Sequence, residues 1–112
     1  MHCIVTAGPT FEPVDMVRRL TNLSTGRLGA TLADRLAARG HEVHLLLSET
    51  ATCPAPVRVE RVARFTTTAN LHDQRASRSG ARFGAVFHAA AVSDFAPAGV
   101  WTRSASGELT LL

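Results

Sequence analysis

The chain has 112 residues, of which 46% are hydrophobic and 19% charged, with a mean hydropathy of +0.08. This is the composition of a globular domain, not of a disordered or fibrous chain. All twelve basic residues are arginine and nine residues are acidic, so the net charge is +3 and chemistry that needs a lysine nucleophile is excluded. No basic run points to nucleic acid, and no apolar run reaches the ~20 residues of a membrane span. No signal segment opens the chain, so we expect one cytoplasmic domain over residues 1–112.

The first predicted element is a strand over residues 2–7, which is apolar on both faces, as in a buried parallel sheet. A long, turn-rich connection over residues 8–25 follows it. A helix is then expected to begin after Ser24 or Thr25, with the hydroxyl as its N-cap, and to end at Gly40. Its predicted apolar stripe consists of Leu28, Leu32 and Leu36.

The rest of the chain predicts four more elements and an extension. A strand is expected over residues 42–47, and a looser one is indicated by Val57, Val59 and Val62. A polar helix anchored by Leu71 is expected over residues 66–79, and a buried strand over residues 85–91. The order β-α-β-β-α-β predicts a parallel α/β sheet with flanking helices and right-handed crossovers. Residues 96–107 are rich in Ala, Pro, Gly and Ser and are expected to be loop. A further strand is expected to begin just after Gly107, where the chain stops, so we expect the fold or its site to be incomplete at that end.

A glycine-rich segment over residues 24–29 opens the predicted helix. The free N–H groups of a helix N-terminus bind phosphates, and glycines let a phosphate approach the backbone. The same residues fit a capped helix whose Gly29 packs against the sheet. Because the segment has neither the G-x-G-x-x-G spacing nor the P-loop lysine, both interpretations stay open.

The connection before the helix carries charged side chains. In dinucleotide-binding folds the glycine turn follows the first strand directly, whereas long loops in compact domains are usually functional. Glu12 and Asp15 suit acid–base groups or Mg²⁺ ligands, although a turn-stabilising role is favoured. Arg18 either pairs with one of them or reaches a phosphate.

Small residues follow the last predicted strand, over residues 89–95. Ligands of open α/β sheets bind at this end of the strands. Asp94 either hydrogen-bonds a ribose or base or forms an Asx turn before Pro97. Asn22 offers both a donor and an acceptor, which also suits a plain turn. His88, inside the apolar strand, is interpreted as a hydrogen-bonded core residue rather than a general base.

The cysteines and the single tryptophan carry no clear signal. Cys3 lies in the first strand and is expected to be a buried small hydrophobe, and Cys53 lies in a loop. Neither a disulfide nor a metal site is expected from their spacing. Trp101 suits a surface anchor or a lid.

The segments VTAGPTFEPVDMVR at residues 5–18, LTNLSTGRLG at residues 20–29 and AAAVSDF at residues 89–95 together carry a resemblance. The chain resembles the phosphopantothenoylcysteine synthetase (phosphopantothenate–cysteine ligase) family, closely over residues 3–47 and well over residues 84–97. The combination is far more specific than any single glycine-rich turn.

The resemblance implies a Rossmann-like, three-layer domain that forms a homodimer and acts in coenzyme A biosynthesis. CTP or ATP, bound with Mg²⁺, would activate 4′-phosphopantothenate as an acyl nucleotide, and cysteine would then displace the nucleotide. The resemblance implies that Asn22 is catalytic and holds the intermediate, with Ala90 and Ala91 beside the substrate. It implies nucleotide contacts at Gly8, Ser24, Thr25, Gly26, His88, Ala89, Ala90 and Asp94.

One departure from the family pattern keeps other functions open. The family usually has a lysine in a mobile loop after the Asp-aromatic pair, but residues 99–103 have none, and Arg103 supplies charge without donating a proton. A degenerate module that binds a nucleotide or a partner without catalysis is therefore an alternative. An NAD(P)-dependent oxidoreductase is another, although residues 45–48 lack the acidic residue expected there, and Tyr and Lys are absent.

Overall fold

The computed structural model describes residues 1–78 and 82–112 and is built around a parallel sheet of four strands. In spatial order these are β5 (Arg61–Phe65), β4 (Glu42–Ser48), β1 (His2–Pro9) and β6 (Ala85–Ala91). All three strand pairs of this sheet are parallel, as predicted. The chain reverses its winding direction beside β1, and open α/β sheets bind ligands at such a switch point.

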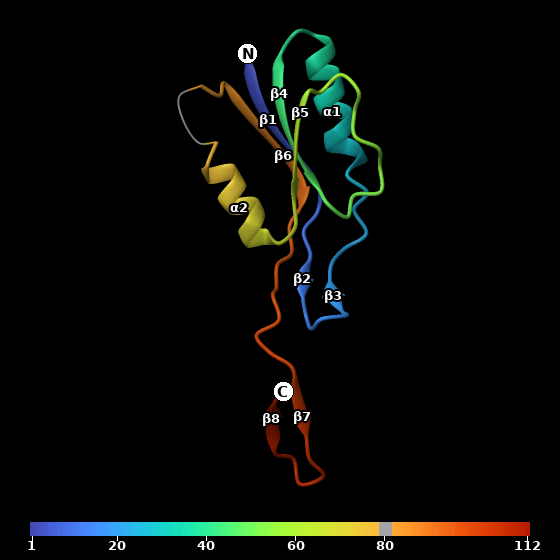
Figure 1. Cartoon of the computed structure of the whole chain (residues 1–112), viewed down its shortest axis with the longest axis vertical. Coiled ribbons are helices and arrows are strands. Elements are labelled where there is room, and N and C mark those ends of the chain that lie inside the picture. The colour runs from blue at the N-terminus through green and yellow to red at the C-terminus, as the bar shows by residue number, and fades with distance from the viewer. Residues whose placement is uncertain (79–81) are drawn as a thin grey trace.

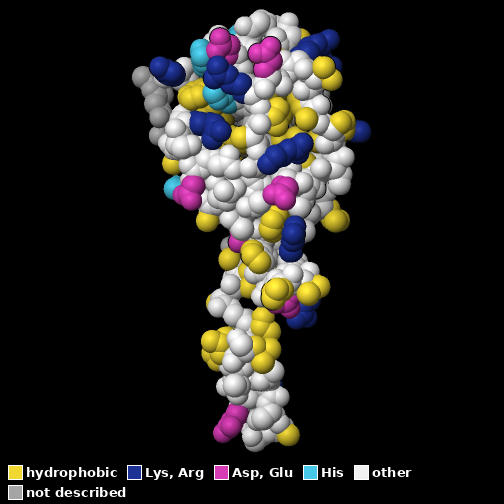
Figure 2. All heavy atoms as spheres, in the orientation of Figure 1, with side chains coloured by type: hydrophobic (Ala, Val, Ile, Leu, Met, Phe, Trp, Pro, Cys, Tyr) yellow, Lys and Arg dark blue, Asp and Glu magenta, His cyan; other side chains and the backbone are white. Residues whose placement is uncertain are grey.

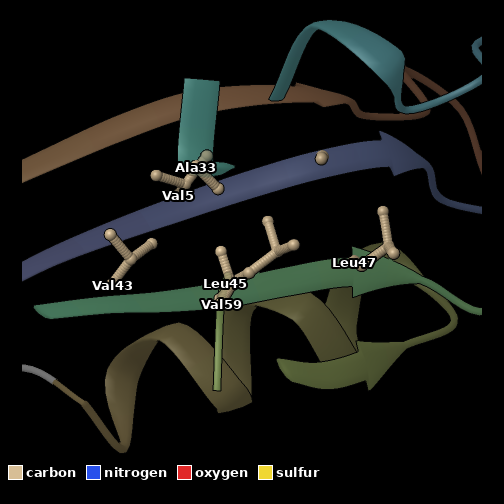
Figure 3. Close-up of a cluster of buried hydrophobic side chains, with 7 residues drawn as sticks. Val5, Ala33, Val43, Leu45, Leu47 and Val59 are labelled. Carbon is tan, nitrogen blue, oxygen red and sulfur yellow. The ribbon is translucent and has the colours of Figure 1, made fainter. Parts of the chain in front are cut away.

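One helix covers each face of the sheet (Figure 1). The helix α1 (Arg27–Ala38) closes a cluster of buried aliphatic side chains, in which Val5, Ala33, Val43, Leu45, Leu47 and Val59 lie together (Figure 3). The helix α2 (Thr68–Ala76) closes a second cluster, made of Ile4, Leu46, Phe65 and Leu71. Successive side chains of a strand point to opposite faces, so β1 and β4 serve both clusters and are apolar throughout. The predicted three-layer α/β architecture is confirmed.

Glycines in left-handed backbone flank α1. Gly26, with φ of 83°, precedes the first helical residue, and Gly40, with φ of 88°, follows the helix end. The predicted end at Gly40 is confirmed. The predicted N-cap at Ser24 or Thr25 is wrong, because the chain turns at Gly26, in a conformation that only glycine adopts freely, and no side chain caps the helix.

The face of α1 that touches the sheet is small rather than leucine-rich. Its buried residues are Gly29, Ala30 and Ala33. The predicted leucine stripe is wrong, because Leu28 is 76% exposed, and Leu32 and Leu36 are only half-buried. Small side chains let α1 approach β1 closely, and the buried face is displaced from the leucines for that reason.

Three other predictions are corrected: the limits of two elements and the burial of a third. The third strand is Arg61–Phe65 rather than the stretch from Val57 to Val62, and Val57 is almost fully exposed. The polar helix is Thr68–Ala76, with Leu71 as its buried anchor, and position 79 of the predicted range lies outside the described residues. The strand β6, predicted to be buried, is an edge strand of the described sheet and leaves Val86 42% exposed. An apolar run does not reveal how many neighbours a strand has.

Two hairpins extend from this core. The strands β2 (Glu12–Pro13) and β3 (Arg19–Leu20) pair within the long connection. The strand expected after residue 107 is β8 (Leu109–Leu111), and it pairs with an unpredicted β7 (Trp101–Arg103). Figure 1 shows this second hairpin projecting away from the sheet, and the molecule measures 64 × 28 × 18 Å. Within the described parts of the chain, no helix has the length and apolar character to cross a membrane.

Candidate functional site

The end of β1 and the start of α1 meet at the carboxyl edge of the sheet without side chains between them. A Cβ atom on Gly26 would lie 3.3 Å from the Cα of Gly8, and one on Gly29 would lie 2.5 Å from the Cβ of Ala7. The helix N-terminus therefore sits directly on the strand end. Its first turn has no acidic residue and no side-chain cap, so its positive end remains available to an anion. Gly29 packs against the sheet, and this packing leaves the helix N-terminus accessible, so the two interpretations of the segment are compatible.

The loop that leads into α1 is held by two hydrogen bonds of Thr25, one through its side chain and one through its backbone. Ser24 is half-buried and Thr25 is exposed. The Thr25 hydroxyl accepts a hydrogen bond from the N–H of Arg27 at 3.3 Å, and its carbonyl accepts one from the N–H of Cys53, also at 3.3 Å. The hydroxyl of Thr25 therefore stabilises the turn before the helix.

Asn22 joins this loop to the end of β6. Its side-chain N–H donates to the carbonyl of Ala91 at 3.0 Å, and its side-chain oxygen accepts from the N–H of Ser24 at 3.0 Å. An amide has a second N–H and a second lone pair, so Asn22 can bind a ligand while it keeps both contacts. The structure therefore brings Asn22 and Ser24 together with Ala91, which lies 69 positions after Asn22 in the sequence.

Thr10 assembles this edge of the sheet, and the sequence analysis did not single it out. It is fully buried. Its hydroxyl donates to the Ser93 hydroxyl at 3.0 Å and accepts from the N–H of Ser93 at 2.8 Å and from the hydroxyl of Thr68 at 3.1 Å. The end of β1, the start of α2 and the segment after β6 are joined in this way. A polar residue directly after a buried strand was the only available signal.

The segment after β6 lies beside the glycine turn. Gly8 is paired with Ala90 in the register of β1 and β6, and Ala89, Ala90 and Ala91 are half-buried. Asp94 is exposed, and Phe95 is 80% exposed. The end of β6 therefore presents small residues, and the exposed carboxylate of Asp94 follows three positions later.

His88 lies two residues before Ala90 on β6 and is not a core residue. Its imidazole is exposed, and Nδ1 lies 2.6 Å from the Thr6 hydroxyl. The interpretation as a buried histidine is wrong because β6 is an edge strand, although the expected hydrogen bond is present. Thr6 also accepts the N–H of Ala90 at 3.2 Å, so it links the histidine to the strand end.

The charged residues of the long connection stabilise structure and do not converge on the glycine turn. A carboxylate oxygen of Glu12 accepts the N–H of Thr68 at the start of α2, at 3.0 Å. Asp15 accepts the N–H groups of Val17 and Arg18 and pairs with the Arg18 guanidinium at 2.5 Å. The hydrogen bonds from Arg18 and Val17 lower the pKa of Asp15 to about 2. The favoured turn-stabilising interpretation of Asp15 is thereby supported, and Arg18 is its partner.

A parallel sheet with a switch point beside β1 and a glycine turn that feeds a helix N-terminus define a Rossmann-like α/β domain. The chain belongs to the family described as the DNA/pantothenate metabolism flavoprotein C-terminal domain, whose model matches residues 1–107. It is 40% identical over 100 residues to the coenzyme A biosynthesis bifunctional protein CoaBC of Mycolicibacterium smegmatis, a match that covers 89% of this chain and 24% of that relative.

Two solved structures share the fold. One is the DNA/pantothenate metabolism flavoprotein from Streptococcus pneumoniae, with a TM-score of 0.77 and 34% identity over 86% of this chain and 42% of that one. The other is the C-terminal domain of the bifunctional protein CoaBC, with a TM-score of 0.77 and 29% identity over 99% of this chain and 53% of that one. The chain thus spans about a quarter of the curated relative and about half of these structures.

Proposed function

We propose that this chain supplies the nucleotide-binding part of a phosphopantothenate–cysteine ligase in coenzyme A biosynthesis, with CTP or ATP as co-substrate. The observation that carries the proposal is the contact between Asn22 and Ala91 beside the uncapped start of α1. It brings a neutral amide and a run of small residues to the edge of the sheet where the N-terminus of α1 lies, which supports a site for a phosphorylated ligand.

Each part of this edge has a chemical role in the proposal. The triphosphate lies against the backbone at residues 24–26, where the close packing of Gly26 on Gly8 holds the helix N-terminus at the strand end. The nucleoside lies along Ala89 and Ala90, near the carboxylate of Asp94. Asn22 keeps its contacts to Ala91 and Ser24 and orients the acyl nucleotide with its remaining amide hydrogen. Cysteine then attacks the activated carbonyl, and the nucleotide leaves.

Mg²⁺ enters this scheme as a complex with the nucleotide. Glu12 and Asp15 are committed to Thr68 and Arg18, and the described residues contain no cluster of three metal-ligating side chains. Mg²⁺ commonly keeps several waters and binds through substrate phosphates and one or two carboxylates. Asp94 is an exposed carboxylate that follows β6, so the residues fit an ion that arrives with the nucleotide.

A second candidate is a module that binds the nucleotide but does not catalyse amide formation. The observation that favours it is the absence of lysine from the whole sequence, since a cation that also donates a proton is then missing from the loop after Phe95. The two candidates share nucleotide binding and differ in amide formation, so one pair of assays separates them.

The first assay measures nucleotide binding. We expect CTP or ATP with Mg²⁺ to bind the chain in isothermal titration calorimetry, and Gly26→Val to weaken binding at least tenfold. Gly40→Val is the matched control, because Gly40 has the same left-handed backbone but no atom within 4 Å of an added Cβ. Unchanged affinity in folded Gly26→Val would contradict the proposed phosphate position.

The second assay measures amide formation by mass spectrometry, with 4′-phosphopantothenate, cysteine and nucleotide. Asn22→Asp places a negative charge beside an anionic intermediate, at a cost of roughly 1–3 kcal/mol, so nucleotide should bind while product is lost. Thr21→Val is the control, because it removes a loop hydrogen bond to the carbonyl of Thr10 but leaves the amide in place. Product from Asn22→Asp at the unmodified rate would overturn the role of Asn22, and nucleotide binding without product from the unmodified chain would favour the second candidate.

A homodimer and a cytoplasmic location belong to the same proposal. The hairpin of β7 and β8 exposes large apolar side chains: Trp101, Leu109 and Leu111 are each more than half exposed. Exposed apolar patches of this kind mark protein contacts. We assign the contact to a second copy of the chain, whose identical hairpin offers the same surface. The phosphorylated substrates of the proposed reaction are water-soluble, which supports the cytoplasm as the site of action.

A further inference from the structure

A basic groove lies at the amino edge of the sheet, at the opposite end from the candidate nucleotide site. It runs between the start of β4, the start of β5 and the end of α2. The hollow has a volume of 410 Å³ and joins a second one of 270 Å³ through shared walls of His44, Arg61, Ser77 and Arg78. Strand β1 runs from His2 to Pro9, and at about 3.3 Å per residue the two edges lie about 20 Å apart.

The groove gathers cations around one imidazole. The Arg61 guanidinium lies 3.2 Å from Nε2 of His44, and the ring of His44 packs edge-on against Phe83 at 5.0 Å between centroids. Arg78 donates to the carbonyl of Gln74 at 2.8 Å, which holds its guanidinium at the end of α2. Arg82 and His2 line the adjoining hollow. Figure 2 shows arginine and histidine side chains gathered in the upper part of the molecule, with acidic side chains beside them at the top.

Two carboxylates lie near the groove. Glu42 pairs with His2 at 3.0 Å, and Glu60 lines a neighbouring hollow beside the end of α1, which Glu42 and Arg61 also line. Across the described part of the chain, the recorded ion pairs of arginine are Arg18 with Asp15 and Arg58 with Asp34, so Arg61 and Arg78 have no carboxylate partner there. Burial lowers the pKa of His44, and the neighbouring Arg61, Arg78 and His2 lower it further, against a small opposing effect of Glu42.

We propose that this groove binds a small soluble phosphate-bearing anion, separate from the nucleotide of the proposed function. The guanidinium group of arginine binds phosphate oxygens through paired N–H donors. Arg61 and Arg78 line one hollow from two different elements, together with His44. The floor of the groove is apolar, with Leu46, Val62 and Ala63. The larger hollow is of the size that holds small molecules, ~300–1,000 Å³. The ligand class is therefore a phosphate or diphosphate with a small organic group.

The test uses inorganic diphosphate as the probe and the whole 112-residue chain. Calorimetry at low salt should show binding that weakens at least tenfold in Arg61→Gln/Arg78→Gln. Arg39→Gln is the control, because it removes an exposed charge at the end of α1, outside the groove. NMR titration should show the pKa of the His44 imidazole rising when diphosphate binds, because an anion favours the charged ring, and His44→Gln assigns that signal.

The possible results separate the groove from other sources of anion binding. Absence of binding, or equal weakening in the groove variant and in Arg39→Gln, would overturn the proposal, since the latter reports only attraction to net charge. Binding that leaves the His44 pKa unchanged and is lost in Gly26→Val would place the anion at α1 and also overturn it. Duplex DNA or phosphatidylglycerol vesicles could instead bind more tightly than diphosphate, with that binding lost in Arg61→Gln/Arg78→Gln. The groove would then bind a nucleic acid or a membrane surface, and the small soluble ligand would be wrong. None of these results bears on amide formation, so the proposed function is tested independently.

Discussion

The hydroxyl of Thr10 makes three hydrogen bonds, which hold the candidate site together without a charged side chain. It joins Ser93, which follows β6, to Thr68, which begins α2, while its own backbone N–H donates to the carbonyl of Ala91 at 3.1 Å. Polar groups that are buried with all bonds made are costly to disturb. The geometry of the strand ends therefore depends on one neutral residue.

Thr10→Val keeps the shape of this side chain and removes its hydroxyl. The N–H of Ser93 and the hydroxyl of Thr68 lose their acceptor, and burying an unsatisfied group costs about 1–3 kcal/mol. We expect the free energy of unfolding in urea to fall by that amount. Thr31→Val, on the exposed side of α1, should change stability little. Equal stability of the Thr10 and Thr31 variants would show that Thr10 does not organise the edge.

Single-residue roles were predictable where local chemistry decides them. The carboxylate of Asp15 stands three positions before Arg18, and a short acidic residue that bonds its own turn is a common local motif. The partner of Asn22 was not predictable, because Ala91 is brought to it by strand pairing between distant segments. The same holds for Thr10 and Ser93. Contacts that strand pairing creates between distant segments cannot be predicted from the local sequence.

At the scale of elements, α1 and β1 approach each other closely at Gly29. A Cβ on Gly29 would lie 2.8 Å from the carbonyl oxygen of Thr6 as well as 2.5 Å from the Cβ of Ala7. Backbone and short side chains cannot move aside as the end of a long side chain does. The position of the helix N-terminus over the strand end therefore depends on the absence of one methyl group.

Gly29→Ala tests this packing by the sign of its effect. In an exposed helix interior, alanine is more stable than glycine by roughly 0.5–1 kcal/mol. Here the overlap with β1 forces the elements apart, and overpacking costs about 1–3 kcal/mol, so we expect a net loss of stability in urea. Ala38→Gly, at the exposed end of the same helix, measures propensity alone. A Gly29→Ala variant more stable than the original chain would show that α1 can shift without cost.

Element types were predictable from the sequence, and their limits and neighbours less so. The continuous apolar runs of β1 and β4 and the glycine after α1 carry strong local signals. The leucines of α1 led to a wrong prediction, because their spacing shows that they share one side of the helix but not that this side faces the sheet. The side that packs against β1 carries small residues instead. The strand β6 was expected to be buried because its sequence is apolar, yet burial also depends on what pairs with its second edge.

At the scale of the whole molecule, the hairpin of β7 and β8 stands apart from the core. Each of its strands has three residues, and a two-stranded hairpin alone is marginally stable in water. Its sequence was expected to be loop up to residue 107, because glycine, proline and serine dominate and no periodicity emerges. The overall shape was therefore the least predictable feature, since it depends on how this hairpin leaves the sheet.

The apolar face of the hairpin predicts how the molecule assembles. Trp101 and Leu111 are directly paired across the strands and are 55% and 56% exposed. Two copies related by a twofold axis present the same face to each other, so one apolar surface covers its own equivalent. Burying tryptophan at the centre of such a contact dominates the binding energy of many interfaces. We therefore expect sedimentation at micromolar concentration to show a species of twice the 11.9 kDa chain mass.

Trp101→Ser/Leu111→Ser should shift this dimer toward monomer, with a dissociation constant at least tenfold higher, or about 1.4 kcal/mol. Thr102→Ser/Thr110→Ser is the control, because this pair lies on the other face of the same hairpin and loses two methyl groups without touching the apolar face. If the control dissociates as readily as the tryptophan variant, the hairpin is merely unstable and its apolar face is not the contact. If the unmodified chain sediments only at 11.9 kDa, the homodimer is wrong for this chain, and the hairpin covers some other partner.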